Sequence, residues 1–358
     1  MRSFIFLLLL IGIPLPSYAQ LSPRQKADDF LAIVASYDRL YAPLPLVSQE
    51  TGFNPLKARP WVERAKVTAS DAEFYQLCRR YLARFGNTQD TLNLTPGPLF
   101  GATLGFTINY YNNTLLIDSI DRDALPETQY PFQIGDQLLS VDHRSIDQWL
   151  DALIPLVAAV NPDFRRSLAA NLIVNRNNPM LPFTPQPGDM ATITVRRQNG
   201  RVEDYSVKWV VQGTAVAEFG PLRAQAPQPA PASPLANILA NRHMPFGALS
   251  ACGAEAFAAV FQDNQRGPIA GKRTQGAGGA LELLPGGFFS EATLTITRTL
   301  FVREQPGSGK LSYIQNAGVT PDIFLDFMTK ENLTGGGRAF VRGFTRSMVS
   351  YLRAPSHP

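Results

Sequence analysis

A cysteine in a turn of small residues is the first candidate for chemistry in this sequence. Cys252 lies in the stretch Ser250-Ala251-Cys252-Gly253-Ala254, between an apolar run at 246–249 and a helical pattern that begins near Glu255. A strand, a tight turn and a helix N-terminus together present a nucleophile, because the helix end favours a thiolate and its free N–H groups can stabilise an oxyanion. Cysteine is also among the residues most often simply buried, so a small core residue is the alternative interpretation.

A second candidate site is the loop Leu104-Gly105-Phe106, at the start of a series of short strands. Apolar runs at 104–108 and 115–117 flank a turn at 111–113, which predicts a hairpin. A further strand follows Gly135-Asp136, and apolar residues recur with helical spacing over 146–154. Another hairpin is predicted around Asn199-Gly200, because this dipeptide favours a two-residue turn.

This order of elements is similar to that of a PDZ domain. The resemblance implies that a polypeptide ligand adds as an extended strand to a sheet edge, and that Leu104, Gly105 and Phe106 are the peptide-binding residues. Backbone N–H groups of this loop would then receive the terminal carboxylate of the peptide. Gly105 suits the role because the carboxylate has to approach the backbone closely.

Helical patterns fill the chain before these strands, from residue 22 to residue 85. The last helix is the best marked. Ser70 and Glu73 form a capping box, apolar residues recur at spacings of three and four over 74–85, and Gly86 ends the helix. Cys78 lies on the apolar face of this helix, which favours a small core residue.

The block around Cys252 carries a second resemblance. Residues 254–264, 266–269 and 271–279, together with 318–323, are similar to the active-site helix, the following turn and the closing motif of the C-terminal processing (tricorn-core) serine peptidases. The Gly-Ala-Gly-Gly turn at 276–279 is closest to the branch that resembles the chlamydial secreted protease. This resemblance implies a serine endopeptidase fold and a polypeptide substrate, cut in unfolded or C-terminal segments.

The catalytic positions that the resemblance implies carry substituted residues. The family has its nucleophilic serine three positions before Glu255, where Cys252 stands here. One branch uses a lysine at the position of Ala277. The branch of the chlamydial protease uses a histidine and a glutamate, at the positions of Gln89 and Gln315. A thiol needs a base to activate it, and an amide side chain takes up no proton at neutral pH.

The peptidase core is also predicted to be shortened. Between the second hairpin and the nucleophile the family places several strands and helices, including a turn that supplies an oxyanion-hole amide. Residues 224–234 hold four prolines among Ala, Gln and Ser instead, which is typical of an extended linker. Loss of one oxyanion donor costs about 10² to 10³ in rate. Two hypotheses stay open: a peptidase, and a catalytically inactive homologue that binds peptides through its PDZ-like domain.

The first 19 residues have the three parts of a signal peptide: a basic start, an apolar run over 4–13, and small residues before Gln20. We therefore expect an exported protein, periplasmic or extracellular, with no membrane span after signal removal. The net charge of +4 includes no basic run that could follow a phosphate backbone, which argues against nucleic acid. The three histidines stand alone, so no metal-ligand spacing is present. No cofactor is expected.

The predicted fold class is an α+β multidomain protein. The predicted division is a signal peptide at 1–19, an N-terminal helical domain at 20–95 and a PDZ-like domain with the adjoining hairpin at 96–212. A Pro/Ala-rich linker at 213–235 leads to a shortened C-terminal α/β peptidase-like domain at 236–358, with a last helix over 340–351. Cys78 and Cys252, the two cysteines, could form a disulfide if the fold brought them together.

Overall fold

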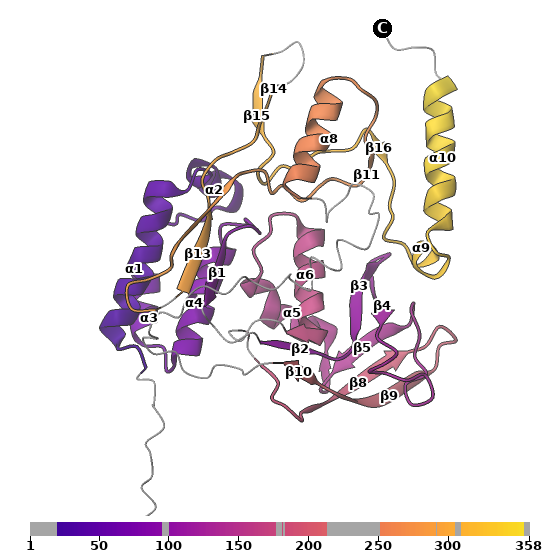
Figure 1. Ribbon diagram of the computed structural model, residues 1–358, viewed down its shortest axis with the longest axis horizontal. Coiled ribbons are helices and arrows are strands. Elements are labelled where there is room, and N and C mark those ends of the chain that lie inside the picture. Colours follow the sequence, from indigo (N-terminus) through magenta and orange to yellow (C-terminus); the bar gives the residue numbers. More distant parts are fainter. Residues whose placement is uncertain are drawn as a thin grey trace, which may run out of the picture.

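The computed structural model describes residues 20–94, 100–176, 181, 183–212, 251–290, 292–304 and 309–353. The predicted signal peptide, the predicted linker and Ser250 of the turn before Cys252 lie outside these residues. Within them the chain forms an N-terminal group of helices, a PDZ-like β-domain and a C-terminal α/β region (Figure 1). The predicted fold class is therefore confirmed.

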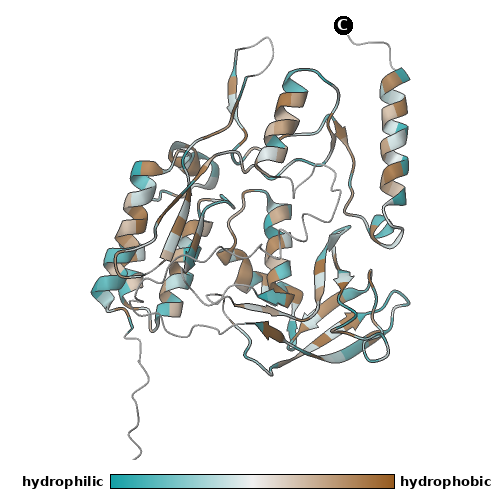
Figure 2. Ribbon diagram, in the orientation of Figure 1, coloured by the Kyte–Doolittle hydropathy of each residue, from teal (hydrophilic) through white to brown (hydrophobic). Residues whose placement is uncertain are grey.

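Four helices form the N-terminal group: α1 (Pro23–Leu40), α2 (Leu44–Thr51), α3 (Arg59–Lys66) and α4 (Asp71–Ala83). Their surfaces carry both apolar and polar positions, as amphipathic helices around a core require (Figure 2). Ser70 caps α4 by accepting from the Glu73 N–H at 3.1 Å. The Glu73 carboxylate accepts from Ala69, one residue before the cap, at 2.7 Å, so the predicted capping box is displaced by one residue on this side.

The helices share their core with a sheet that joins a strand just after α4 to two strands from the C-terminal part of the chain. The sheet has the order β1-β13-β12, with β1 (Thr91–Leu94), β13 (Ala292–Thr297) and β12 (Leu281–Pro285) all antiparallel. One apolar cluster includes residues from the four helices and from β13, among them Phe30, Tyr37, Tyr81, Phe85, Ala292, Leu294 and Ile296. Residues 281–297 therefore belong with the helices, although the sequence groups them with the C-terminal domain.

The β-domain has its own core and a sheet of the order β3-β4-β5-β8-β9. The strands are β3 (Phe106–Tyr111), β4 (Thr114–Ile120), β5 (Gln137–Val141), β8 (Met190–Arg196) and β9 (Val202–Lys208), and β6 (Arg144–Ser145) pairs with β5. The predicted hairpin turn is present at Asn112 and Asn113, which both have positive φ, as a type I′ turn requires.

Helices and a small sheet complete the β-domain. The helical elements are α5 (Ile146–Leu153), the 3₁₀ turn η1 (Ile154–Leu156) and α6 (Pro162–Val174). The small sheet has the order β10-β2-β7, formed by β10 (Val210–Gln212), β2 (Gly101–Thr103) and β7 (Asn175–Arg176). This sheet brings the end of α6 next to the predicted peptide-binding loop.

The rest of the C-terminal region has a small core. It consists of α8 (Gly253–Asp263), the parallel pair β11 (Ala270–Gly271) and β16 (Ile323–Phe324), the antiparallel pair β14 (Val302–Glu304) and β15 (Leu311–Tyr313), and helices α9 (Lys330–Thr334) and α10 (Arg338–Arg353). In the described part, five buried apolar residues form its core cluster. Phe257 and Val260 of α8 are about 60% exposed.

The two cysteines are both free: Cys78 is buried in the helical group and Cys252 is exposed. Among the described residues, no single helix has the length and apolar character needed to cross a membrane. Helices α1 and α2 reach that length and composition only together, and they are bent by 105° at the break between them. The same part of the chain contains no cluster of three or more side chains suited to a metal ion.

Candidate active site and peptide-binding loop

Cys252 lies at the N-terminus of α8 with a strained backbone. Its φ of 54° and ψ of −117° fall where side-chain-bearing residues are rarely found. Its N–H lies 3.1 Å from the Ala277 oxygen and 3.2 Å from Glu255 Oε2. A sharp, strained turn into a helix is also how the nucleophile elbow of hydrolases exposes its side chain. The conformation therefore presents the thiol to solvent at a helix N-terminus.

Glu255 holds the turn beside Cys252 in place. Its buried carboxylate accepts from Thr274 Oγ1 at 2.5 Å, from the Gly276 N–H at 2.6 Å and from the Ala277 N–H at 2.7 Å. Hydrogen bonds to a charged group are stronger than those between neutral groups. Glu255 therefore fixes the Gly-rich turn against the first turn of α8, and its oxygens are engaged in structure.

Ala277 contacts Cys252 through a backbone hydrogen bond. It is 1% exposed, its carbonyl accepts from Cys252 and its N–H donates to Glu255. The position that carries a lysine in one branch of the family thus contributes a methyl group and no amine.

Gln315 touches the same turn from the other side. Its Oε1 accepts from the Gly278 N–H at 3.1 Å, and its Nε2 donates to Asn316 Oδ1 at 3.0 Å. Asn316 Nδ2 in turn contacts Glu50 of α2. Both ends of the buried Gln315 amide are therefore used to connect the turn with the helical group.

Gln89 lies on the segment that follows α4. Its neighbour Thr88 accepts a hydrogen bond from Gln275 of the Gly-rich turn, which brings this segment to the site. The Gln89 N–H donates to Asn87 Oδ1 at 3.1 Å, while its buried Oε1 has no partner in the part of the chain that the structure describes. The structure thus places the four predicted catalytic positions on or beside residues 274–279.

A titratable group next to Gln89 carries no motif that distinguishes it in the sequence. Asp90 is buried, and burial raises its pKa to about 7. Its Oδ1 accepts from the backbone N–H and the hydroxyl of Thr297, both at 3.0 Å. Asp90 therefore ties the end of β13 to the segment that carries Gln89.

The predicted peptide-binding loop joins β2 to β3. Leu104 N–H donates to the Val174 oxygen at 3.0 Å, and Gly105 N–H to Thr103 Oγ1 at 3.0 Å. Gly105 has a φ of 79°, and a Cβ there would lie 3.1 Å from the Leu125 side chain. The backbone conformation and the Leu125 contact thus favour glycine at this position, and two amides of the loop already have partners within the chain. Phe106 is buried and begins β3.

Helix α6 lies along β3, which is an edge strand of the large sheet. At one end Asn175 Nδ2 donates to the Phe106 oxygen at 3.3 Å. At the other end Arg166 donates to Asn113 Oδ1 at 2.5 Å and covers the ring of Tyr110. The space between α6 and β3, where a PDZ ligand would add, is therefore bridged at both ends.

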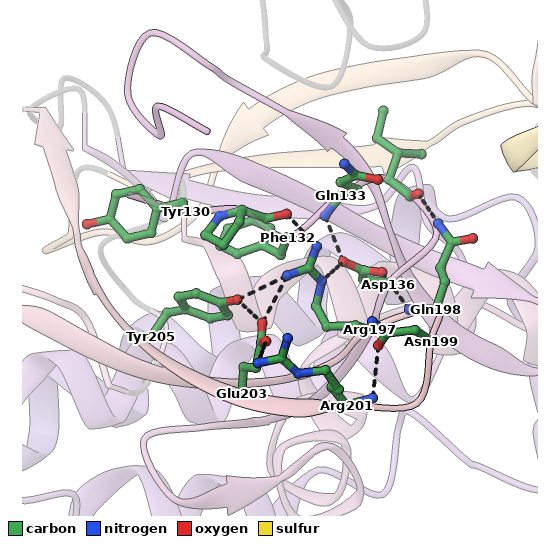
Figure 3. A network of polar contacts seen from close by, with 12 residues as sticks. Tyr130, Phe132, Gln133, Asp136, Arg197, Gln198, Asn199, Arg201, Glu203 and Tyr205 are labelled. Carbon is green, nitrogen blue, oxygen red and sulfur yellow. Dashed lines mark hydrogen bonds and ion pairs between the residues drawn. The ribbon is translucent and has the colours of Figure 1, made fainter. Parts of the chain in front are cut away.

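The Gly135-Asp136 motif is part of a polar network (Figure 3). Asp136 Oδ2 accepts from the Gln133 N–H at 2.7 Å and from Arg197 Nε at 2.8 Å. Arg197 also pairs with Glu203 at 2.9 Å. The network fastens the hairpin between β8 and β9 to the loop before β5, so this motif is structural.

Comparisons with known proteins support the fold. A model of the PDZ domain family matches residues 101–218. A search of curated proteins gives no match. The structure of mature CPAF, a chlamydial secreted protease, in complex with lactacystin superposes with a TM-score of 0.70 and 14% identity, covering 92% of this chain and 99% of that chain. A second structure of mature CPAF superposes with a TM-score of 0.68 and 14% identity, covering 88% of this chain and 95% of that chain.

An identity of 14% establishes the fold and not the activity. The two resemblances predicted from the sequence, to a PDZ domain and to the fold of the chlamydial secreted protease, are confirmed at that level. The chain therefore contains a PDZ domain and has the fold of the secreted protease CPAF.

Proposed function

We propose that this protein is an exported relative of the C-terminal processing peptidases that captures unfolded or C-terminal polypeptide segments through its PDZ domain, and that its cleavage of peptide bonds is weak or lost. The observation that carries this proposal is the pair of amides, Gln89 and Gln315, at the positions of the family's histidine and glutamate. In support, Gln315 accepts from Gly278 of the turn beside Cys252, and Gln89 follows Thr88, which accepts from Gln275 of the same turn.

Proton transfer is the step that these residues fail to supply. A general base has to lie within hydrogen-bond reach of the proton that it removes, and its pKa has to suit the working pH. The Gln315 amide accepts no proton, and its two ends are bound to Gly278 and Asn316. Ala277 has no ionisable group. A thiol at Cys252 is thus left without the base that either branch of the family would provide.

A second candidate function is a thiol peptidase with a base of its own. The exposed, strained position of Cys252 at the start of α8 favours it, because a helix N-terminus supplies N–H donors to an oxyanion. Such an enzyme would take its base from outside the four family positions.

Peptide capture is compatible with the contacts of the loop. The Gly105 N–H is bound to the hydroxyl of Thr103, and that hydroxyl also bonds Asn175 Oδ1 at 2.6 Å. A peptide carboxylate is a stronger acceptor than a hydroxyl. It can therefore replace Thr103 at the Gly105 amide while Thr103 keeps its bond to Asn175.

The proposal is tested by measuring, on the same peptide, whether the protein binds it and whether the protein cleaves it. Fluorescent unstructured peptides that end in an apolar residue, with either a free or an amidated C-terminus, are titrated with the protein and then analysed by mass spectrometry. We expect the free carboxylate to bind at least tenfold more tightly, and the peptide to stay intact.

Two glycine variants provide the matched comparison. Gly105→Ala places a Cβ against Leu125 at positive φ and should abolish binding, whereas Gly101→Ala meets no atom within 4 Å and should leave it unchanged. Equal affinity for amidated peptide would contradict capture by the loop. Fragments that disappear in Cys252→Ala would establish the second candidate instead.

A further inference from the structure

Every residue of helix α10 is exposed or half-buried. It follows α9 and stands beside the body of the protein, attached at one end (Figure 1). None of its residues is buried. Its exposed large apolar side chains are Val341 (59%), Phe344 (41%), Val349 (40%), Tyr351 (42%) and Leu352 (80%).

The start of α10 is held firmly against α9. The Phe340 N–H donates to Asn332 Oδ1 at 2.6 Å. The Phe340 ring packs edge-on against Phe327, with the ring centroids 5.5 Å apart. Arg342 pairs with Glu331 at 3.1 Å on the surface. These contacts fix the first turns of α10 against α9 and Phe327, and so they fix the orientation of the helix.

Apolar and basic residues occupy opposite sides of α10. With about 100° of rotation per residue, one stripe about 120° wide holds six apolar residues: Phe340, Val341, Phe344, Met348, Tyr351 and Leu352. The other side holds four arginines, Arg338, Arg342, Arg346 and Arg353, together with Val349. The helix contains no acidic residue, and both kinds of residue recur along it (Figure 2).

We propose that α10 binds to the surface of a membrane rich in anionic phospholipid, lying parallel to it. A helix with a strong apolar side, an arginine-rich polar side and low overall hydrophobicity is of the kind that binds at lipid interfaces. The arginines supply attraction to phosphate headgroups. With 16 residues α10 is shorter than the roughly 20 needed to span a bilayer. This proposal does not depend on cleavage or on peptide capture.

The size of the helix favours lipid over a second copy of the chain. Sixteen residues make a rod about 24 Å long and 10 Å across. One side of it offers well below the roughly 800 Å² that each partner buries in a standard protein interface. A lipid surface takes up such a helix without further contacts.

Vesicle flotation of the purified full chain tests the proposal. Vesicles of phosphatidylcholine alone are compared with vesicles that contain phosphatidylglycerol. We expect binding to the second kind only, a reduction of tenfold or more in Leu352→Asp, and a reduction of about fivefold for each arginine replaced among Arg342→Gln, Arg346→Gln and Arg353→Gln.

Controls use exposed residues of the same types elsewhere. Leu311→Asp on β15 changes a leucine that is 64% exposed, and Arg24→Gln removes an arginine whose side chain is 92% exposed; both should bind like the wild type. Binding that is equal on the two kinds of vesicle, absent from both, or unchanged in Leu352→Asp would overturn the proposal. So would a dimer in sedimentation that Leu352→Asp dissociates, because the occupant would then be a second copy.

Discussion

The two cysteines differ in the properties that control thiol chemistry. Cys252 is exposed at a helix N-terminus. Cys78 is fully buried in the helical core, where burial and the nearby charge of Asp29 raise the pKa of its thiol well above the usual value. Reaction with a disulfide reagent requires both access and thiolate, so the fold makes one thiol reactive and protects the other.

Titration of the native protein with a chromogenic disulfide reagent should therefore release one equivalent rapidly. The second equivalent should appear only in denaturant. Cys252→Ala should lose the rapid phase and Cys78→Ala should keep it. A rapid phase that survives in Cys252→Ala would contradict the burial of Cys78.

Glu255 is expected to stabilise the folded protein. Glu255→Gln keeps the size of the side chain but places an NH₂ group against donors such as the Ala277 N–H. We expect a loss of about 2 to 4 kcal/mol in the free energy of unfolding, measured by urea denaturation. The control Glu63→Gln removes a surface pair with Lys66 and should cost less than about 1 kcal/mol. Equal effects of the two changes would show that the contacts of Glu255 are unimportant.

The sequence predicted the turn and the helix at Cys252, but not the hydrogen bonds of the side chains around them. The small residues around Cys252 and the helical pattern that begins near Glu255 predicted a turn before a helix, because both are local signals. The Gly-rich turn that Glu255 and Gln315 both bond lies 19 to 37 residues from them, and no local signal specifies these contacts. Gln89 could be assigned only through the family resemblance.

At the scale of elements, the Gly-rich turn depends on close packing against the segment after β15. Gly276 has a φ of 88°, and a Cβ there would lie 2.8 Å from the Asn316 carbonyl carbon. Gly276→Ala should therefore destabilise the protein by roughly 2 to 4 kcal/mol in thermal unfolding. Gly253→Ala, in the first turn of α8, meets no atom within 4 Å and should be neutral or stabilise by up to about 1 kcal/mol. Similar losses in both would contradict this packing.

Asp90 ties β13 to the segment that carries Gln89, and its contribution to the free energy of unfolding should depend on pH. Because the pKa of Asp90 is raised to about 7 in the folded protein, the folded state holds a proton that the unfolded chain releases near pH 4. This contribution to stability is present below pH 4 and is lost as the pH rises to about 7.

Asp90→Asn removes the ionisable group, so the variant should not lose this stability as the pH rises. Its stability relative to the wild type should grow by about 2 to 3 kcal/mol between pH 5 and pH 8, measured by urea unfolding. Asp151→Asn, at an exposed position, serves as the control. A difference that stays constant with pH would show that Asp90 is charged in the folded protein throughout this range.

At the scale of the whole molecule, the N-terminal helices and the strands β12 and β13 form one unit. Strand β1 pairs with β13, which lies about 200 residues later. The buried Asp29 of α1 accepts from the N–H groups of Phe288, Phe289 and Ser290 at 2.6 to 2.9 Å. The PDZ domain, inserted between these segments, has a separate core. Helices and hairpins could be predicted from periodicity and turn residues, whereas this long-range pairing leaves no local signal.

The proposed loss of cleavage is tested most directly by degradation of unfolded casein, followed by mass spectrometry, with the wild type, Cys252→Ala and the double variant Gln89→His/Gln315→Glu. We predict no fragments from the wild type or from Cys252→Ala. Slow cleavage by the double variant would show that the missing base is what prevents catalysis. Fragments from the wild type that vanish in Cys252→Ala would contradict the proposal, because the protein would then be an active thiol peptidase.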